Sequence, residues 1–99
     1  MPKSKPRVIL DRRARDNLKK IPGNTRQAII AELNALACSP RPAKSKRLVI
    51  EKESREVRRL RLGKWRIIYL VQDEQPVILA IHRRPPYDYQ DLEELLKDL

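Results

Sequence analysis

The sequence predicts a small α+β domain with the element order β-α-α-β-β-β-α: an antiparallel meander sheet with an N-terminal helical hairpin packed on one face, and a short C-terminal helix. Three observations lead to this prediction. The 99 residues suffice for one domain, because a second core would need about 50 more. Apolar residues recur at helical spacing between residues 11 and 38, and short strand-like runs separated by turns follow from residue 48. We therefore expect residues 1–99 to form a single domain.

The first two elements are a short strand and a helix. Residues 7–11 form an apolar run that suits a strand, and Asp11 is a good N-cap for the segment after it. That segment has apolar residues on one helical face, namely Ala14, Leu18 and Ile21. The Pro22-Gly23 pair is expected to end the helix.

A second helix is expected to begin at Asn24, with Gln27 three residues later in capping-box spacing. Its apolar positions are Ile29, Leu33 and Leu36. The pattern ends near Cys38, which we interpret as a small buried hydrophobic residue. Residues 39–47 are predicted to form a proline-rich basic loop.

The second half of the chain is expected to form strands. Residues 48–50 make a short candidate, and three longer ones follow at residues 57–62, 65–72 and 77–83. Gly63-Lys64 and residues 73–76 separate the longer candidates. The last segment predicts a short amphipathic helix from its leucines, Leu92, Leu95, Leu96 and Leu99.

The net charge of the chain restricts its possible binding partners more than its length does. Lys and Arg number 23 against 13 Asp and Glu, a net charge of +10, which predicts attraction to RNA, DNA, an acidic membrane surface or an acidic protein. Residues 88–99 hold five acids and one lysine, so the tail carries −4 and residues 1–87 carry +14.

No apolar run approaches a membrane span, no signal peptide is evident, and one cysteine excludes an internal disulfide or a multi-cysteine metal site. We expect a soluble cytoplasmic protein.

The two turns predict a row of arginines. If Gly63-Lys64 is a two-residue type II′ turn, Leu62 pairs with Trp65 and Arg61 lies opposite Arg66. If residues 73–76 form a four-residue turn, Arg66 lies opposite Arg83. Because side chains alternate between faces, Arg61, Arg66 and Arg83 then share one face, and Arg59 joins them two residues along. Like charges side by side weaken a sheet, so the row suggests a ligand with adjacent phosphates; its alternative is a solvated face with separate salt bridges.

The same face would also hold apolar residues that need cover, namely Ile68, Leu70, Leu79 and Ile81. The C-terminal leucine helix or a helix of a partner would supply it. The opposite face, which receives Tyr69 and Trp65, is expected to pack against the helical hairpin.

Residues 58–69 (RRLRLGKWRIIY), followed by Ile81-His82-Arg83-Arg84 and Tyr87, resemble the RelE/ParE superfamily of bacterial toxin–antitoxin systems, most strongly its RelE branch. The resemblance implies a toxin that cleaves mRNA in the ribosomal A site by 2′-OH attack, without metal or other cofactor. It places the catalytic residues at Arg59, Arg61, Arg66, Arg83 and Tyr87, with Tyr89 a weaker match to the family's tyrosine. It also implies an acidic or amphipathic antitoxin partner, whose complex with the toxin can bind operator DNA.

The sequence does not decide which residue is the general base that activates the 2′-OH. Arginine cannot act as a base because its pKa exceeds about 12, and this chain has Arg59 and Arg61 where the RelE pattern often has lysines. A tyrosine hydroxyl beside arginines can act as the base, because cations lower its pKa from about 10. This argument favours Tyr87. An imidazole, with an ordinary pKa near 6.5, suits the chemistry, but the predicted register places His82 on the core face.

Further basic residues predict a surface for RNA phosphates: Arg58, Lys64, Arg84, Lys44, Lys46 and Arg47. Two other functions compete with RNA cleavage. A ParE-like toxin would inhibit DNA gyrase by binding it, and a non-catalytic RNA- or ribosome-binding protein would satisfy the composition alone.

Overall fold

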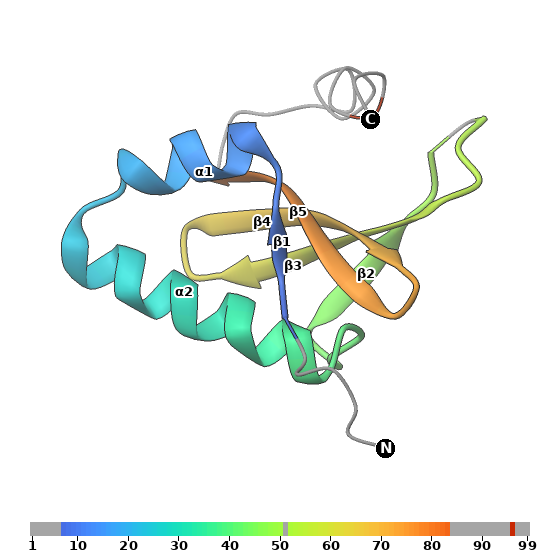
Figure 1. Cartoon of the computed structure of the whole chain (residues 1–99), viewed down its shortest axis with the longest axis horizontal. Helices are drawn as coiled ribbons and strands as arrows, with labels where there is room; N and C mark the ends of the chain where they lie inside the picture. The colour runs from blue at the N-terminus through green and yellow to red at the C-terminus, as the bar shows by residue number, and fades with distance from the viewer. Residues whose placement is uncertain (1–6, 51, 84–95, 97–99) are drawn as a thin grey trace.

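The computed structural model describes residues 7–50, 52–83 and 96. Two helices and a five-stranded sheet follow one another in the order β1-α1-α2-β2-β3-β4-β5 (Figure 1), which confirms the α+β class. The strands are β1 (Ile9–Leu10), β2 (Ser45–Leu48), β3 (Glu56–Leu62), β4 (Trp65–Gln72) and β5 (Gln75–Arg83), and the helices are α1 (Arg12–Lys19) and α2 (Gly23–Cys38). Of the predicted C-terminal helix, all but Leu96 lies outside the described residues.

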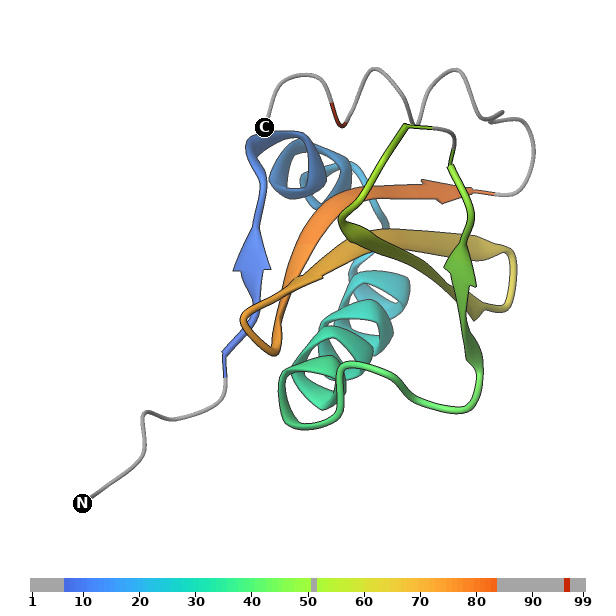
Figure 2. The same ribbon diagram turned by 90° about the vertical axis from the view of Figure 1, so that its right-hand side faces the viewer.

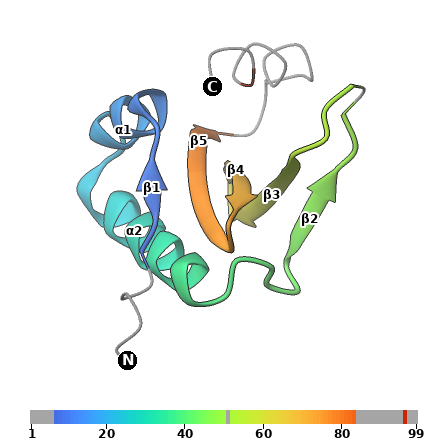
Figure 3. The same cartoon turned by 45° about the vertical axis from the view of Figure 1, so that its right-hand side comes forward.

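The sheet has the strand order β1-β5-β4-β3-β2 and is mixed rather than wholly antiparallel. β1 is shorter than predicted and runs parallel to β5, where Ile9 pairs with Val77 (Figure 3). Beyond this pairing, α1 lies along the edge of β5. There Asn17 Oδ1 accepts a hydrogen bond from the Ile81 N–H at 3.1 Å. A strand edge that would otherwise leave a donor unpaired is thereby covered.

Helix α1 begins as predicted. Asp11 Oδ2 accepts a hydrogen bond from the Arg13 N–H at 3.1 Å, and the Arg13 side chain forms an ion pair with the same oxygen at 3.0 Å. Burial alone would raise the pKa of Asp11, but the hydrogen bonds and charge of Arg13 outweigh it, and the pKa is lowered.

Helix α2 ends at Cys38, as predicted, but its start and the burial of Cys38 differ from the prediction. It begins at Gly23, with Pro22 in the N-cap position and no side-chain cap, so Asn24 and Gln27 do not form a capping box. Proline is suited to a helix start because its fixed φ costs nothing there. Cys38 is exposed rather than buried: two residues beyond Leu36, it is turned by about 200° away from the apolar stripe.

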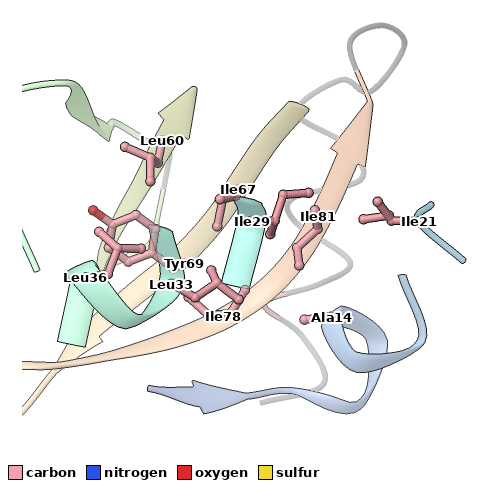
Figure 4. Packing of buried hydrophobic residues seen from close by; sticks show 10 residues of the cluster. All are labelled: Ala14, Ile21, Ile29, Leu33, Leu36, Leu60, Ile67, Tyr69, Ile78 and Ile81. Carbon is pink, nitrogen blue, oxygen red and sulfur yellow. The ribbon is translucent and has the colours of Figure 1, made fainter. Parts of the chain in front are cut away.

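The core lies between the helices and one face of the sheet (Figure 4). It contains Ala14, Ile21, Ile29, Leu33, Leu36, Leu60, Ile67, Tyr69, Ile78 and Ile81. Trp65 packs against this cluster, as predicted. Tyr69 is fully buried, and its hydroxyl donates a 2.7 Å hydrogen bond to the Pro40 carbonyl, which fastens the segment after α2 to the sheet.

The first hairpin of the meander forms as predicted. Leu62 pairs with Trp65 and Arg61 with Arg66. Gly63 has a φ of +58°, and Lys64 does not share this left-handed conformation, as a type II′ turn requires.

The second turn is shorter than the predicted four residues. Gln72 pairs with Gln75, leaving Asp73 and Glu74 as the central residues with φ values of 53° and 61°, the type I′ pattern. Pro76 then pairs with Val71 inside the ladder. Gln72 and Gln75 form the hydrogen-bonded pair that closes the turn, and hydrogen-bonded and non-hydrogen-bonded pairs alternate along an antiparallel ladder. The Val71–Pro76 pair is therefore a non-hydrogen-bonded one, and the missing N–H of proline costs nothing there.

Strand β2 begins and ends earlier in the chain than the predicted strand at residues 48–50. It occupies Ser45–Leu48 and pairs antiparallel to β3 (Figure 2). Residues 45–47 fall in the segment expected to be a loop, and only Leu48 belongs to the candidate strand at residues 48–50. β2 is an edge strand with exposed Lys46 and Arg47, so its sequence lacks the apolar alternation of a half-buried strand.

Candidate functional site

The sheet face opposite the helices, here called the outer face, is built from three cross-strand rows. The first row is apolar and consists of Leu48, Val57, Leu70 and Val77. The second is mixed and consists of Lys46, Arg59, Ile68 and Ala80. The third is basic and consists of Arg61, Arg66 and His82. Polarity therefore rises from the β4–β5 turn toward the β3–β4 turn.

Arg66 is the central member of the basic row and is only 6% exposed. Its Nη1 donates hydrogen bonds to the carbonyls of Gly63 at 3.2 Å and Trp65 at 3.1 Å. The Gly63 turn therefore holds the guanidinium in place as well as reversing the chain. Arg61, the residue of β3 that pairs with Arg66, is exposed. It makes no hydrogen bond or ion pair within the described residues. The two guanidiniums offer an anchored and a free donor set side by side.

The mixed row contains a polar group without a partner. Arg59 Nε is buried, and no hydrogen-bond acceptor meets it within the described part of the chain. Its neighbour on β2 is Lys46, another cation. A buried donor left unsatisfied costs about 1–3 kcal/mol, so this row lowers the stability of the isolated fold.

The apolar row is covered from the C-terminal segment. Leu96 is buried and packs with Leu48, Val57, Ile68, Leu70, Leu79 and Ala80, which agrees with the expectation that a C-terminal leucine covers this area. The Leu96 carbonyl accepts a 3.2 Å hydrogen bond from Arg55. Arg55 is held by Glu53 at 2.8 Å, and its hydrogen bonds lower the pKa of Glu53 to about 2.

The predicted arginine row is wrong at β5. His82, and not Arg83, lies opposite Arg66; Arg83 pairs with Trp65 on the helix side. The cause is the two-residue turn together with a β-bulge, in which Leu79 is inserted between Ile78, opposite Tyr69, and Ala80, opposite Ile68. A bulge changes which residues face each side. Residues 78–81 are all buried, so the sequence has no alternation from which the bulge could be predicted.

The remaining predicted residues separate into three groups. Arg58 lies on the helix side, bonded to Ser45 Oγ at 3.1 Å and to Glu56 at 3.1 Å, and Lys44 is paired with Glu32 at 2.6 Å. Lys46, Arg47 and Lys64 are exposed, and only Lys46 belongs to the outer face. Arg84, Tyr87 and Tyr89 lie outside the described residues.

Neither a metal site nor a membrane span is found in the described part of the chain. Residues 7–50, 52–83 and 96 contain no cluster of His, Cys, Asp and Glu that could hold a metal ion. Neither α1 nor α2 is long and apolar enough to cross a membrane. The chemistry available on the outer face is that of guanidinium, ammonium and imidazole groups, which bind phosphates and move protons.

A mixed sheet with a helical hairpin on one face and basic rows on the other is compatible with the RelE/ParE superfamily that the sequence resembles. The sequence matches, over residues 8–84, the family described as the ParE toxin of the type II toxin–antitoxin system ParDE. The chain belongs to this family, and it is a toxin of a type II toxin–antitoxin system. A search of curated protein sequences found no match.

Similar solved structures come from RelE toxins and their complexes. A chain of the archaeal RelE–RelB complex from Pyrococcus horikoshii OT3 has a TM-score of 0.70 at 22% identity, covering 85% of this chain and 100% of that one. A chain of the Mycobacterium tuberculosis complex RelBE2 has a TM-score of 0.68 at 26% identity, with coverages of 82% and 100%. The isolated E. coli RelE toxin has a TM-score of 0.65 at 18% identity, with coverages of 94% and 98%. The first and third likenesses establish the fold alone.

Proposed function

We propose that this toxin arrests translation by cleaving mRNA in the ribosomal A site, with the outer face as the surface that binds the scissile phosphate. The observation that carries the proposal is the basic row, in which Arg61 and Arg66 face each other across two strands. Like charges in direct register destabilise a sheet. A phosphodiester bound between them would convert this repulsion into attraction and accept bidentate hydrogen bonds from guanidinium.

The reaction proposed is an intramolecular transfer. The 2′-oxygen attacks the adjacent phosphorus, the bond from phosphorus to the 5′-oxygen breaks, and the products are a 2′,3′-cyclic phosphate and a 5′-hydroxyl. Charge accumulates on the phosphoryl oxygens in the transition state. Arg66, held by two hairpin carbonyls, is preorganised to stabilise that charge, which is the larger share of catalysis in such sites.

Two protons must move, one from the 2′-OH and one to the leaving 5′-oxygen. Arginine does not lose its proton in proteins, so the arginines stabilise charge only. His82 stands directly across from Arg66, and an imidazole can both accept and donate a proton near neutral pH. We therefore propose His82 for one of the two transfers, with Tyr87 of the sequence motif as the alternative group. Arg83, on the helix side, is proposed to contact RNA without facing the scissile phosphate.

The test is primer extension on translated mRNA after induction of the toxin. Wild type is expected to give cuts at A-site codons, and Arg61→Gln and His82→Gln are expected to lower cutting at least about 100-fold while keeping the wild-type unfolding midpoint. Arg7→Gln, which removes an exposed cation far from the row, is the charge-matched control for Arg61→Gln and should cut normally. Growth arrest without cuts, or full cutting by Arg61→Gln, would overturn the proposal.

A second candidate function follows from the family match, because the matching family is named for ParE toxins. Under it, the toxin would bind and inhibit DNA gyrase without RNA chemistry. A supercoiling assay with purified gyrase separates the two candidates. Inhibition by wild type that persists in His82→Gln would favour this second function, because binding alone has no need of an acid–base group.

The proposed partner is a cognate antitoxin that supplies an acidic or amphipathic segment to the outer face. The similar structures from Pyrococcus horikoshii and Mycobacterium tuberculosis are toxin–antitoxin complexes, which supports such a partner. Carboxylates facing Arg61, and apolar side chains that replace Leu96 over the apolar row, would match the polarity of the three rows. A peptide that binds in this way should protect Arg61 from guanidinium-modifying reagents.

A further inference from the structure

Helix α1 carries a basic stripe on the side that faces away from the sheet. Ala14 is fully buried and Asn17 bonds to β5, which fixes the inner side of the helix. At 100° per residue, one acid, Asp16, and three cations fall on the outer side. The cations are Arg12, Arg15 and Lys19, and all three are exposed. We call these three residues the α1 stripe. None of them takes part in the outer face described above.

The α1 stripe is not explained by the stability of the helix. Cations near a helix N-terminus oppose the macrodipole, and the first turn of α1 holds Arg12 and Arg13 with no acidic residue. Arg13 is neutralised by Asp11. Arg12 and Arg15, three residues apart, make no ion pair within the described residues, and like charges at this spacing weaken a helix by a few tenths of a kcal/mol.

The composition of the stripe indicates its ligand. The exposed positions of α1 are Arg12, Arg15, Asp16 and Lys19, and none is apolar. Protein interfaces rely on buried aromatic or aliphatic anchors at their centre, which this surface lacks. Evenly spaced cations suit a phosphodiester backbone instead, and Arg12 and Lys19 are separated by about 10 Å along the helix axis.

We propose that the α1 stripe binds the phosphodiester backbone of RNA outside the segment that is cleaved. The identity of the polymer rests on the proposed function, whereas the stripe itself does not. The Asn17–Ile81 hydrogen bond places α1 beside the end of β5 that carries His82, so one RNA can meet both surfaces. Arg83 is exposed on the helix side of β5, two residues beyond the Ile81 amide to which Asn17 bonds.

The experiment measures binding of 2′-O-methyl oligonucleotides, which lack the 2′-hydroxyl nucleophile and stay intact. A tetranucleotide reaches one surface only, and a strand of about 20 nucleotides reaches both, since a nucleotide spans at least about 3.4 Å. Fluorescence anisotropy at several salt concentrations is compared for wild type, Arg12→Gln/Arg15→Gln and a control, Arg7→Gln/Lys52→Gln. Both double variants remove two exposed cations, so net charge is matched.

For the longer strand, Arg12→Gln/Arg15→Gln should reduce the slope of log K against log salt by about 1.4, or about 0.7 for each phosphate that the stripe no longer neutralises. The tetranucleotide should bind unchanged, and the slope of the control should fall by less than half as much. The variant should also unfold at the same or a higher temperature, because cations are removed from the helix N-terminus.

An equal reduction of slope in the control would reduce the effect to net charge and overturn the proposal. So would an unchanged slope in Arg12→Gln/Arg15→Gln, including the case in which this variant loses only antitoxin binding. Failure of the proposed nuclease is a separate result: no A-site cuts would appear, while the difference between the two double variants in oligonucleotide binding would persist.

Discussion

The two faces of the sheet use the same strands for different purposes. On the helix side, Leu60, Ile67 and Tyr69 are fully buried and belong to the apolar core cluster. The residues that alternate with them along β3 and β4 point to the outer face, and they include Arg59, Arg61 and Arg66. Strand alternation thus lets a single hairpin carry the core and the candidate site. The comparison predicts that substitutions on one face change stability and those on the other change binding.

The largest loss of stability is expected from Leu33→Ala, which would leave a cavity in the helix-side core. Leu33 is 2% exposed, so the free energy of unfolding should fall by about 2–5 kcal/mol in a urea titration. Ile30→Ala, on the same helix but 38% exposed, is the control and should cost less than about 1 kcal/mol. Equal costs for the two variants would contradict the assigned helix face.

A smaller loss is expected from Tyr69→Phe. The substitution keeps the ring in the core but leaves the Pro40 carbonyl without its 2.7 Å hydrogen bond, so the free energy of unfolding should fall by about 1–3 kcal/mol. Oligonucleotide binding should stay at the wild-type level, because the ring lies on the helix side. A loss of binding without a loss of stability would show that the two faces are coupled.

Acid is expected to loosen the outer face before the core. The pKa of Glu53 is about 2 when folded, because Arg55 donates hydrogen bonds to it, against about 4.3 in an unfolded chain. A depressed pKa contributes stability above the unfolded value, and this stability is lost as the pH falls from about 5 to 2. Since Arg55 also bonds to the Leu96 carbonyl, hydrogen exchange of the Leu96 amide should quicken relative to that of Leu33. Glu53→Gln should remove this pH dependence.

The smallest change in stability is expected from Arg61→Gln. Arg61 is exposed and faces Arg66, so removing its charge should leave the free energy of unfolding within about 0.5 kcal/mol of wild type, with any change in the stabilising direction. The urea titration used for Leu33→Ala measures it. A loss above about 1 kcal/mol would mean that Arg61 supports the fold, and the contrast between the faces would fail.

The sequence predicted the elements that depend on local signals. Asp11 caps α1, Gly63 sets the first hairpin, and the Arg61–Arg66 pair follows from that turn alone. These features need only residues close together in the chain, where turn chemistry and capping decide the conformation.

The features that could not be predicted depend on distant pairing. β2 is a strand because β3 offers it an edge, although its own sequence is basic. The second turn contains Asp73 and Glu74 instead of the glycine or asparagine that usually marks a type I′ turn. His82 reaches the site only because the ladder places Leu79 as an extra residue. Tertiary contacts decide all three.

The bulge at Leu79 also divides β5 into two stretches, and a deletion at the bulge has a different effect on the register at Arg66 from a deletion after it. Deleting Leu79 would leave His82 opposite Arg66, because the residues on either side already pair with Ile68 and Tyr69. Deleting Ile81 instead would bring Arg83 into the position of His82 and exchange an imidazole for a guanidinium. A one-residue change in the length of β5 can therefore exchange the side chain that faces Arg66, as a substitution of His82 also would.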